Sequence, residues 1–393
     1  MDLIVGVSRL LALAGPTRLL ACALLSVAPL SLVAATSIAR TGSVATAASC
    51  NSGYFGGISL SAAPYNRSEL VALANGVCTD QKWHVETSLD GGRTWRLGAT
   101  LAPTMSPSDI QPVAPQGTLL MIDLEHGGQL MRSADDGVTW SAVLSLRPFG
   151  GGGESEGQDI VADPSSPSRT FVCLRRGVVE TTDSGVSWHR VIGAPRACGR
   201  LIIQPGSGRV VLVAGAGHAI ARSADSGLHW TVVRGSARDA IGNYNIAFDT
   251  SSPNVVVAAL GPPIDNRNFG IYRSTDAGQH WTLAARIPER QWFPGGSRTR
   301  GTVLYGGRFV AGPWFKYTDG GGGCEKLGWF VSSDGVGWHH VLRTRRICDQ
   351  PDFGLGVALG DSVVTVGDLE NAAGPIYRLG RADSSWTVVG QLQ

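Results

Sequence analysis

The chain repeats one short stretch of sequence, first seen as Ser88-Leu89-Asp90-Gly91-Gly92-Arg93-Thr94-Trp95, with the pattern Ser/Thr-x-Asp-x-Gly-x-x-Trp. Four further copies are intact, one near the C-terminus is a residue short, and the last has lost its glycine. The aspartates of the seven copies, 45, 48, 42, 51, 58 and 49 residues apart, are Asp90, Asp135, Asp183, Asp225, Asp276, Asp334 and Asp383. A period of about 40 to 50 residues is typical of one supersecondary unit per repeat, stacked on its neighbours.

Each copy lies between segments in which apolar and polar residues alternate, as in residues 270–274 before the fifth copy and 281–284 after it. Alternation on both sides of turn-forming residues predicts a β-hairpin whose turn is the repeated stretch. In such a turn the aspartate accepts backbone N–H groups, the glycine permits positive φ, and the tryptophan buries a large apolar face. The repeat is therefore expected to be structural.

These turns resemble Asp-box repeats, also called BNR repeats, and from Ile58 onward the chain resembles the Asp-box β-propellers of the sialidase-like superfamily. It is similar to the seven-bladed photosystem II assembly factor and to xyloglucanase-type propellers. The resemblance implies an all-β fold, a seven-bladed β-propeller with four antiparallel strands per blade and an Asp-box hairpin between the third and fourth strands. It leaves function open, because this turn occurs in enzymes and non-enzymes alike.

Strand positions follow from the alternation and from the Gly, Pro, Asn and Ser residues between the segments. The first repeat predicts strands at about 57–63, 70–74, 83–87 and 95–100, and the fourth at about 201–204, 209–214, 219–223 and 230–233. No stretch after residue 50 shows sustained helical periodicity. The last repeat ends with its own fourth strand at 386–391, so ring closure is not expected to borrow a strand from the N-terminus.

The N-terminal residues differ from the rest of the chain. Arg9 and Arg18 precede an apolar run over 19–35, and small residues follow as far as Ala48. This pattern predicts an export signal over residues 1–47, with an uncleaved membrane anchor as the alternative. Residues 48–393 are then one propeller domain, located outside the cell or in its envelope.

Six cysteines follow the predicted signal, and an even number in an exported chain indicates disulfides. Fifteen pairings are possible, and we prefer the sequential one because each pair would then join equivalent places in its repeats. The preferred pairs are Cys50 with Cys78, Cys173 with Cys198, and Cys324 with Cys348. The absence of any Cys-x-x-Cys spacing argues against a structural metal site.

Composition argues against several classes of function. The net charge is only +2 and no Lys/Arg stripe with interleaved aromatic residues is present, so nucleic-acid binding is not expected. The chain has no Gly-x-Ser-x-Gly nucleophile motif and no Gly-x-x-x-x-Gly-Lys phosphate loop. We expect a monomer without a cofactor or metal.

Function is expected on the rim opposite the boxes, where the loops vary in length. Glu154, Glu156 and Asp159 follow the glycines at 150–153, and a pair of carboxylates there would suit glycoside hydrolysis. A flexible, solvated loop is the alternative reading of the same stretch. Short loops such as Arg176-Gly177 are expected to contribute little.

A second group of candidates on this rim is aromatic and basic. Trp292 and Tyr317 could stack on sugar rings or on peptides. Arg238, Arg267 and Arg298 could clamp carboxylates. Scattered surface arginines and aromatic residues facing a blade core are the alternatives for these positions.

The sequence therefore favours an exported, non-enzymatic binding or scaffold propeller that recognises an extracellular or envelope glycan or protein through its inter-blade loops. The alternative is a glycoside hydrolase, xyloglucanase-like or sialidase-like, that uses acidic residues on the same rim. Xyloglucanases of the resembling type place acids across a cleft between two propellers. This chain has the repeats for one propeller, so the resemblance transfers no catalytic residue to it.

Overall fold

The structure, a computed structural model, describes residues 58–75, 82–150, 159–196, 198–214, 220–234, 245–260, 270–286, 302–317, 324–341, 356–366, 375–383 and 385–392. These residues form seven four-stranded antiparallel sheets, as the sequence predicts. Their helical content is two single 3-10 turns, η1 (Glu125–Gly127) and η2 (Arg147–Phe149), and none of it is long and apolar enough to span a membrane. The predicted export signal lies outside the described residues and stays a prediction.

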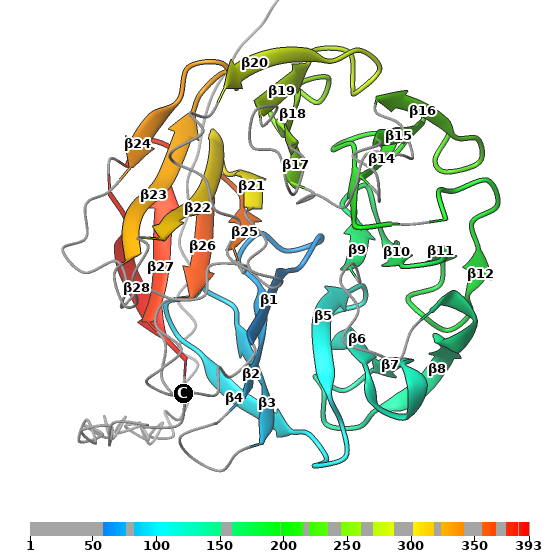
Figure 1. The fold of residues 1–393 in the computed structure, drawn as a ribbon. Helices are drawn as coiled ribbons and strands as arrows, with labels where there is room; N and C mark the ends of the chain where they lie inside the picture. The colour runs from blue at the N-terminus through cyan, green and yellow to red at the C-terminus, as the bar shows by residue number, and fades with distance from the viewer. Residues whose placement is uncertain are drawn as a thin grey trace, which may run out of the picture. The chain divides into compact units, whose positions relative to one another are not determined.

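Each sheet, or blade, consists of four strands that are consecutive in the chain (Figure 1). Blades 1 and 2 contain β1 (Ile58–Ala62), β2 (Leu70–Asn75), β3 (Trp83–Ser88), β4 (Arg96–Thr100), β5 (Pro107–Val113), β6 (Thr118–Asp123), β7 (Gln129–Ser133) and β8 (Ser141–Ser145). Blades 3 and 4 contain β9 (Asp159–Asp163), β10 (Ser166–Leu174), β11 (Gly177–Thr181), β12 (His189–Arg190), β13 (Arg200–Ile203), β14 (Val211–Ala214), β15 (Ile220–Ser223) and β16 (Thr231–Arg234).

The remaining blades follow the same order. Blades 5 and 6 contain β17 (Asn245–Phe248), β18 (Val256–Leu260), β19 (Gly270–Ser274), β20 (Thr282–Arg286), β21 (Thr302–Tyr305), β22 (Phe309–Tyr317), β23 (Cys324–Ser332) and β24 (His339–Val341). Blade 7 contains β25 (Gly356–Leu359), β26 (Ser362–Val366), β27 (Pro375–Gly380) and β28 (Thr387–Gln391). The strands predicted for the first and fourth repeats are confirmed, with small shifts at their ends.

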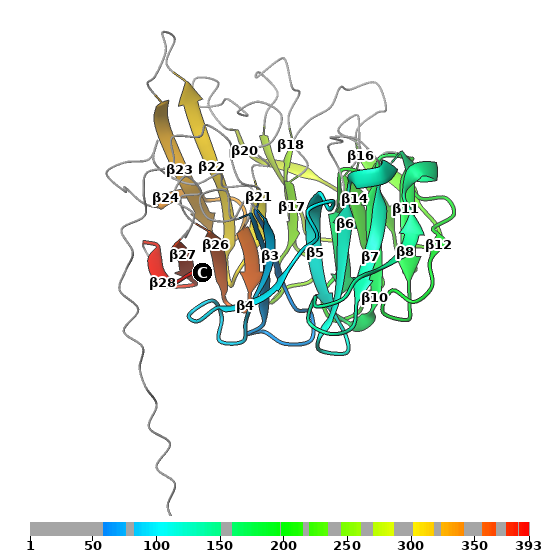
Figure 2. The same cartoon turned by 90° about the horizontal axis from the view of Figure 1, so that it is seen from below.

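The first strands of successive blades pack against one another, and β25 packs against β1, which closes the ring. Blade 7 is complete with its own fourth strand, so the prediction that closure borrows no N-terminal strand is confirmed. Because consecutive strands are antiparallel, the turns joining first to second and third to fourth strands lie on one rim, here called the box rim. The linkers between blades and the turns joining second to third strands lie on the other, here called the linker rim (Figure 2).

The repeated turn is held by hydrogen bonds within its own few residues, as the copy at Asp135 illustrates. The hydroxyl of Ser133 donates to Asp135 Oδ1 at 2.8 Å and accepts the N–H of Gly137 at 2.9 Å. The backbone N–H and the hydroxyl of Thr139 donate to the two carboxylate oxygens of Asp135 at 2.9 and 2.7 Å. Gly137 has a φ of 84°, and its carbonyl accepts the indole N–H of Trp140 at 2.8 Å.

Every blade interface has its own apolar core, and each core includes the repeat tryptophan of the blade that follows the interface. Trp230, for example, packs with Phe171 of blade 3 and Val211 of blade 4. The seven tryptophans, one in each core, are Trp95, Trp140, Trp188, Trp230, Trp281, Trp338 and Trp386. The local turn thus places an aromatic ring between neighbouring blades, where burial of apolar area stabilises the ring.

Arginines join several of these turns to the preceding blade. The guanidinium groups of Arg132, Arg222 and Arg273 donate to the backbone carbonyls of the next blade's turn, those of Ser184, Ala277 and Asp334, at 2.8, 2.9 and 2.7 Å. In blade 3, the guanidinium group of Arg169 in β10 donates to the backbone carbonyl of Ser226 in the turn of blade 4. The same guanidinium group also donates to the carboxylate of Glu180 in β11.

The turn aspartates make stability depend on pH. Hydrogen bonds from Thr139 lower the pKa of Asp135, and at Asp90 the bonds from Thr94 and Ser88 outweigh burial and lower the pKa to about 2. A folded-state pKa below the unfolded value of about 4 contributes stability above that value and loses it as pH falls through the folded pKa. We therefore expect the urea midpoint of unfolding to fall steeply between about pH 4 and pH 2.

Two variants test the origin of this acid sensitivity. Asp135→Asn should lower the urea midpoint at pH 7 and reduce the change between pH 4 and pH 2, because Asn cannot gain or lose that proton. Asp361→Asn, in the exposed turn between β25 and β26, is the matched control and should follow the wild-type curve. If the urea midpoint of Asp135→Asn changes with pH in parallel with that of the wild type, Asp135 is not a source of the acid sensitivity.

The arginine contacts between blades predict a second stability effect. Arg222→Met removes the donor to the Ala277 carbonyl and should lower the free energy of unfolding by about 1 to 2 kcal/mol in urea titrations. Arg209→Met, at an exposed position beside β14, should change it by less than about 0.5 kcal/mol. Equal effects of the two changes would show that the contact between blades contributes nothing.

Candidate functional site

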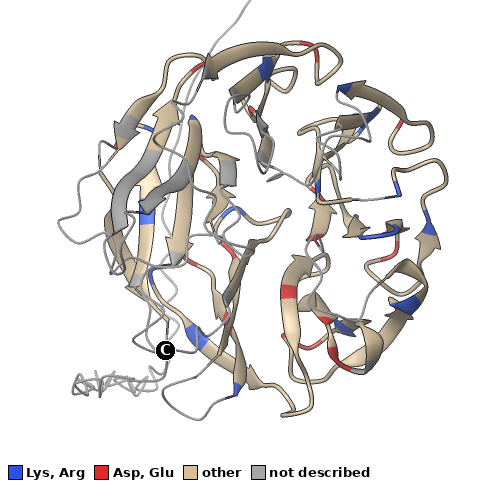
Figure 3. Ribbon diagram, viewed as in Figure 1, with Lys and Arg blue, Asp and Glu red and all other residues tan. Residues whose placement is uncertain are grey.

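A cleft of about 680 Å³ lies on the linker rim at blade 3. It is formed by the η2 turn, by the turn between β10 and β11, and by β12 with the linker that follows it. Its lining includes the four arginines Arg175, Arg176, Arg190 and Arg196 and the aliphatic residues Pro148, Val191, Ile192 and Ala194. The ribbon in this part of the molecule carries several Lys and Arg segments (Figure 3). None of the described residues that line the cleft is acidic, so its potential is positive.

Contacts within the cleft walls fix two of the arginines. The backbone N–H of Arg176 donates to the Phe149 carbonyl at 3.0 Å, which joins the β10–β11 turn to η2. Arg190 donates to the Arg176 carbonyl at 2.7 Å, and its guanidinium lies 5.3 Å from the centre of the Phe149 ring. Gly177 closes the turn with a φ of 137°, a conformation that other residues rarely adopt. The guanidinium of Arg190 is therefore held in place at the cleft wall.

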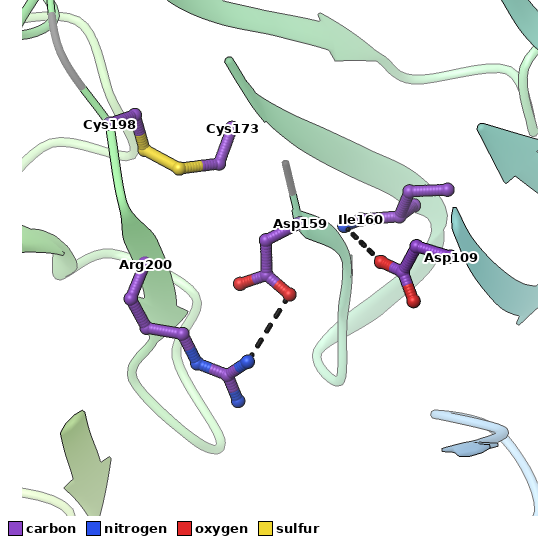
Figure 4. Close-up of a disulfide and its surroundings, with 6 residues drawn as sticks. All are labelled: Asp109, Asp159, Ile160, Cys173, Cys198 and Arg200. Carbon is purple, nitrogen blue, oxygen red and sulfur yellow. Dashed lines mark hydrogen bonds and ion pairs between the residues drawn. A yellow bond between two sulfur atoms is a disulfide. The ribbon is translucent and has the colours of Figure 1, made fainter. Parts of the chain in front are cut away.

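A disulfide between Cys173 and Cys198 lies beside the cleft and joins β10 to the linker before β13 (Figure 4). It confirms the predicted pairing of these two cysteines. Cys50, Cys78, Cys348 and the side chain of Cys324 lie outside the described residues, so the other two predicted pairs stay predictions.

Acidic residues lie nearer the ring axis, on the innermost strands of blades 2 and 3. Asp159 begins β9, is only 6% exposed, and its Oδ1 lies 3.2 Å from the guanidinium of Arg200 on β13 (Figure 4). Asp109 of β5 accepts the backbone N–H of Ile160 at 2.9 Å and the hydroxyl of Ser59 at 2.8 Å. These contacts run from β1 to β13 and tie the first strands of four blades together.

The arrangement gives these carboxylates structural partners. Asp159 Oδ2 has no hydrogen-bond partner among the described residues, but the atom is buried and the other oxygen is paired with Arg200. Among the described residues, no group of three or more His, Cys, Asp or Glu side chains could hold a metal ion.

Most of the sequence-predicted site residues lie outside the part of the chain that the structure describes. Those residues are Glu154, Glu156, Arg238, Arg267, Trp292 and Arg298, together with the side chain of Tyr317 in β22, and all of them stay predictions. Asp159 is described, in the ion pair above. Little contribution is expected of the short Arg176-Gly177 turn, yet both residues line the cleft, and their role in binding is part of the proposal below.

Sequence reasoning missed three of the four cleft arginines, Arg175, Arg176 and Arg190. One local signal was available, the Arg175-Arg176 doublet directly before a turn glycine. Arg190 carries no such signal, since it reaches the cleft only through the pairing of β11 with β12.

Comparison with known proteins supports the fold. No protein-family model matches the chain. It is 27% identical over 172 residues to the xyloglucanase Xgh74A of Acetivibrio thermocellus, covering 42% of this chain and 17% of that protein. It is 23% identical over 255 residues to a xyloglucanase of a Paenibacillus species, covering 57% of this chain and 25% of that protein. The chain therefore spans at most a quarter of the length of these relatives.

A solved structure of YCF48 bound to D1 peptide superposes with a TM-score of 0.51 at 14% identity, covering 80% of this chain and 92% of that one. At such identity the likeness shows the fold alone. Together these findings define the chain as a seven-bladed β-propeller similar to xyloglucanase and YCF48 propellers.

The ion pair near the ring axis predicts a strong coupling between its partners. Arg200→Met leaves the buried carboxylate of Asp159 uncompensated and should lower the free energy of unfolding by about 2 kcal/mol or more. Asp159→Asn combined with Arg200→Met should recover part of that loss in the same urea titration. Strictly additive costs in this double-mutant cycle would show that the two side chains are not coupled.

Proposed function

We propose that this protein is a non-enzymatic binding propeller that recognises an acidic polypeptide through the arginine-lined cleft on its linker rim. The observation that carries the proposal is the set of four arginines around one cleft with no acidic residue among its described lining. Guanidinium groups bind carboxylates through two parallel hydrogen bonds, so such a cleft suits a partner with several carboxylates.

The composition of the cleft favours a polypeptide over a glycan. Sugar rings are commonly bound by stacking on flat aromatic side chains, and none of the described lining residues is aromatic. The lining is instead basic and aliphatic, and the side chain of Ile192 is 77% exposed beside the arginines. A peptide in which acidic and apolar side chains alternate would match both kinds of surface.

Export to the cell exterior or envelope is part of the proposal. The disulfide supports it, because such bonds persist in oxidising compartments. The signal-like sequence over residues 1–47 also supports export.

Glycoside hydrolysis is the second candidate, favoured by the sequence similarity to xyloglucanases over 42% and 57% of this chain. Hydrolysis by the usual route needs two carboxyl groups about 5 to 9.5 Å apart, one of them available as a proton donor. Of the described acids near the ring axis, Asp159 is paired with Arg200, and Asp109 accepts hydrogen bonds from two blades. Because both carboxylates are held in contacts that join the blades, we favour binding over hydrolysis.

A synthetic peptide of alternating Glu and Leu, labelled with fluorescein, is the probe for this proposal. It should bind the full chain, whereas a Lys-Leu peptide of equal length should not. Exchanging Arg175 and Arg196 for Gln should weaken binding at least about tenfold and reduce its salt dependence, because two charged contacts are lost. Fluorescence anisotropy at several salt concentrations measures both effects.

Arg209→Gln is the matched control, since this exposed arginine lies before β14 on the box rim and outside the cleft. It should bind the Glu-Leu peptide as the wild type does. Polygalacturonate binding in place of peptide binding would identify an acidic glycan as the ligand and overturn the polypeptide proposal. Release of reducing sugar from xyloglucan, lost in Asp159→Ala, would favour the hydrolase.

A further inference from the structure

The Cys173–Cys198 disulfide joins the two segments that carry opposite sides of the arginine cleft. Cys173 lies in β10, two residues before Arg175, and Cys198 lies two residues after Arg196 in the linker to blade 4. The bond therefore connects the base of the β10–β11 turn to the end of the linker. Both arginines lie within two residues of a bridged cysteine.

The linker has few other attachments. It is bound at its start, where the Val191 N–H donates to the Val178 carbonyl at 2.9 Å, and at its end, where the Cys198 N–H donates to the Leu174 carbonyl at 3.3 Å. Between these points, residues 192–196 make no backbone hydrogen bond to other described residues. Arg196 is exposed, so packing does not hold it either.

The opposite wall is held more firmly, since the Arg176 backbone and the Arg190 guanidinium are both fixed against Phe149. The position of Arg196 relative to this wall then depends on the disulfide, together with the hydrogen bond from Cys198 to Leu174 and the packing of Ala194 on the core. Both sulfur-bearing residues are buried in the core between blades 3 and 4, Cys173 fully and Cys198 at 4% exposure. The bond thus lies within that core.

We infer that Cys173–Cys198 is a positioning element of the binding site, which holds Arg196 at a set distance from Arg175 and so raises affinity for the acidic peptide. This inference rests on the proposed function of the cleft. A flexible segment that becomes ordered on binding loses conformational entropy, and holding it beforehand removes that cost. The cleft would therefore reach full affinity only where the disulfide forms, in an oxidising compartment.

The test uses the full chain with Cys173→Val and Cys198→Ala, which keeps the buried positions apolar. We expect affinity for the Glu-Leu peptide to fall about tenfold. The affinity should also depend less on salt concentration, because Arg196 no longer contacts the peptide. Unchanged affinity, within about twofold, would overturn the inference. Hydrogen exchange should rise at the hydrogen-bonded amides of residues 191 and 198 and stay unchanged in blades 5 to 7.

A loss of stability alone could also weaken binding, and Arg222→Met controls for it. That change lowers stability at the interface of blades 4 and 5 without touching the cleft, so it should leave peptide affinity as in the wild type. Unchanged hydrogen exchange at the amides of residues 191 and 198 of the cysteine variant would refute the positioning role whether or not the peptide binds. If exchange differs between the wild type and the cysteine variant as expected but the wild type binds no peptide, the proposed function is refuted instead.

Discussion

The hydrogen bonds between a serine or threonine hydroxyl, an aspartate carboxylate and a glycine N–H, present in six of the seven repeats, are the constraint on which the ring depends. In the five intact repeats they hold two successive residues at positive φ, such as Asp136 at 57° and Gly137 at 84°. That conformation turns the chain so that the tryptophan enters the core between blades and a backbone carbonyl faces the preceding blade. Since each blade contacts only its neighbours, stability is approximately a sum over such interfaces.

The two rims of the propeller are stabilised by different means, and this difference determines where function can arise. The box rim uses the same turn in blade after blade. Among the described residues of blades 2 to 4, the linker rim is held by the Cys173–Cys198 disulfide, the Arg200–Asp159 ion pair and the contact of Arg190 with Phe149. Because these contacts do not repeat, the loops between them are free to differ in length and charge.

The fold could be predicted because its determinants are local, whereas those of the site are not. The hydroxyl, carboxylate and glycine of a turn lie within five residues of one another, so their pattern is visible in the sequence. Arg176 and Arg190 are 14 residues apart and meet only through strand pairing and Phe149 of the previous linker. Asp159 was named as a candidate catalytic acid without its ion pair, because its partner, Arg200, lies 41 residues away in another blade.

The distribution of charge on the linker rim decides between a site on the ring axis and one beside it. The single described arginine–aspartate pair near the axis, Arg200 with Asp159, is neutral as a unit. The four arginines of the cleft face no acid among its described lining, although the whole chain carries only +2. An acidic partner is therefore attracted to the cleft over roughly a Debye length, about 8 Å at physiological salt. An anionic ligand should therefore bind off the axis, away from the carboxylates that a hydrolase would need.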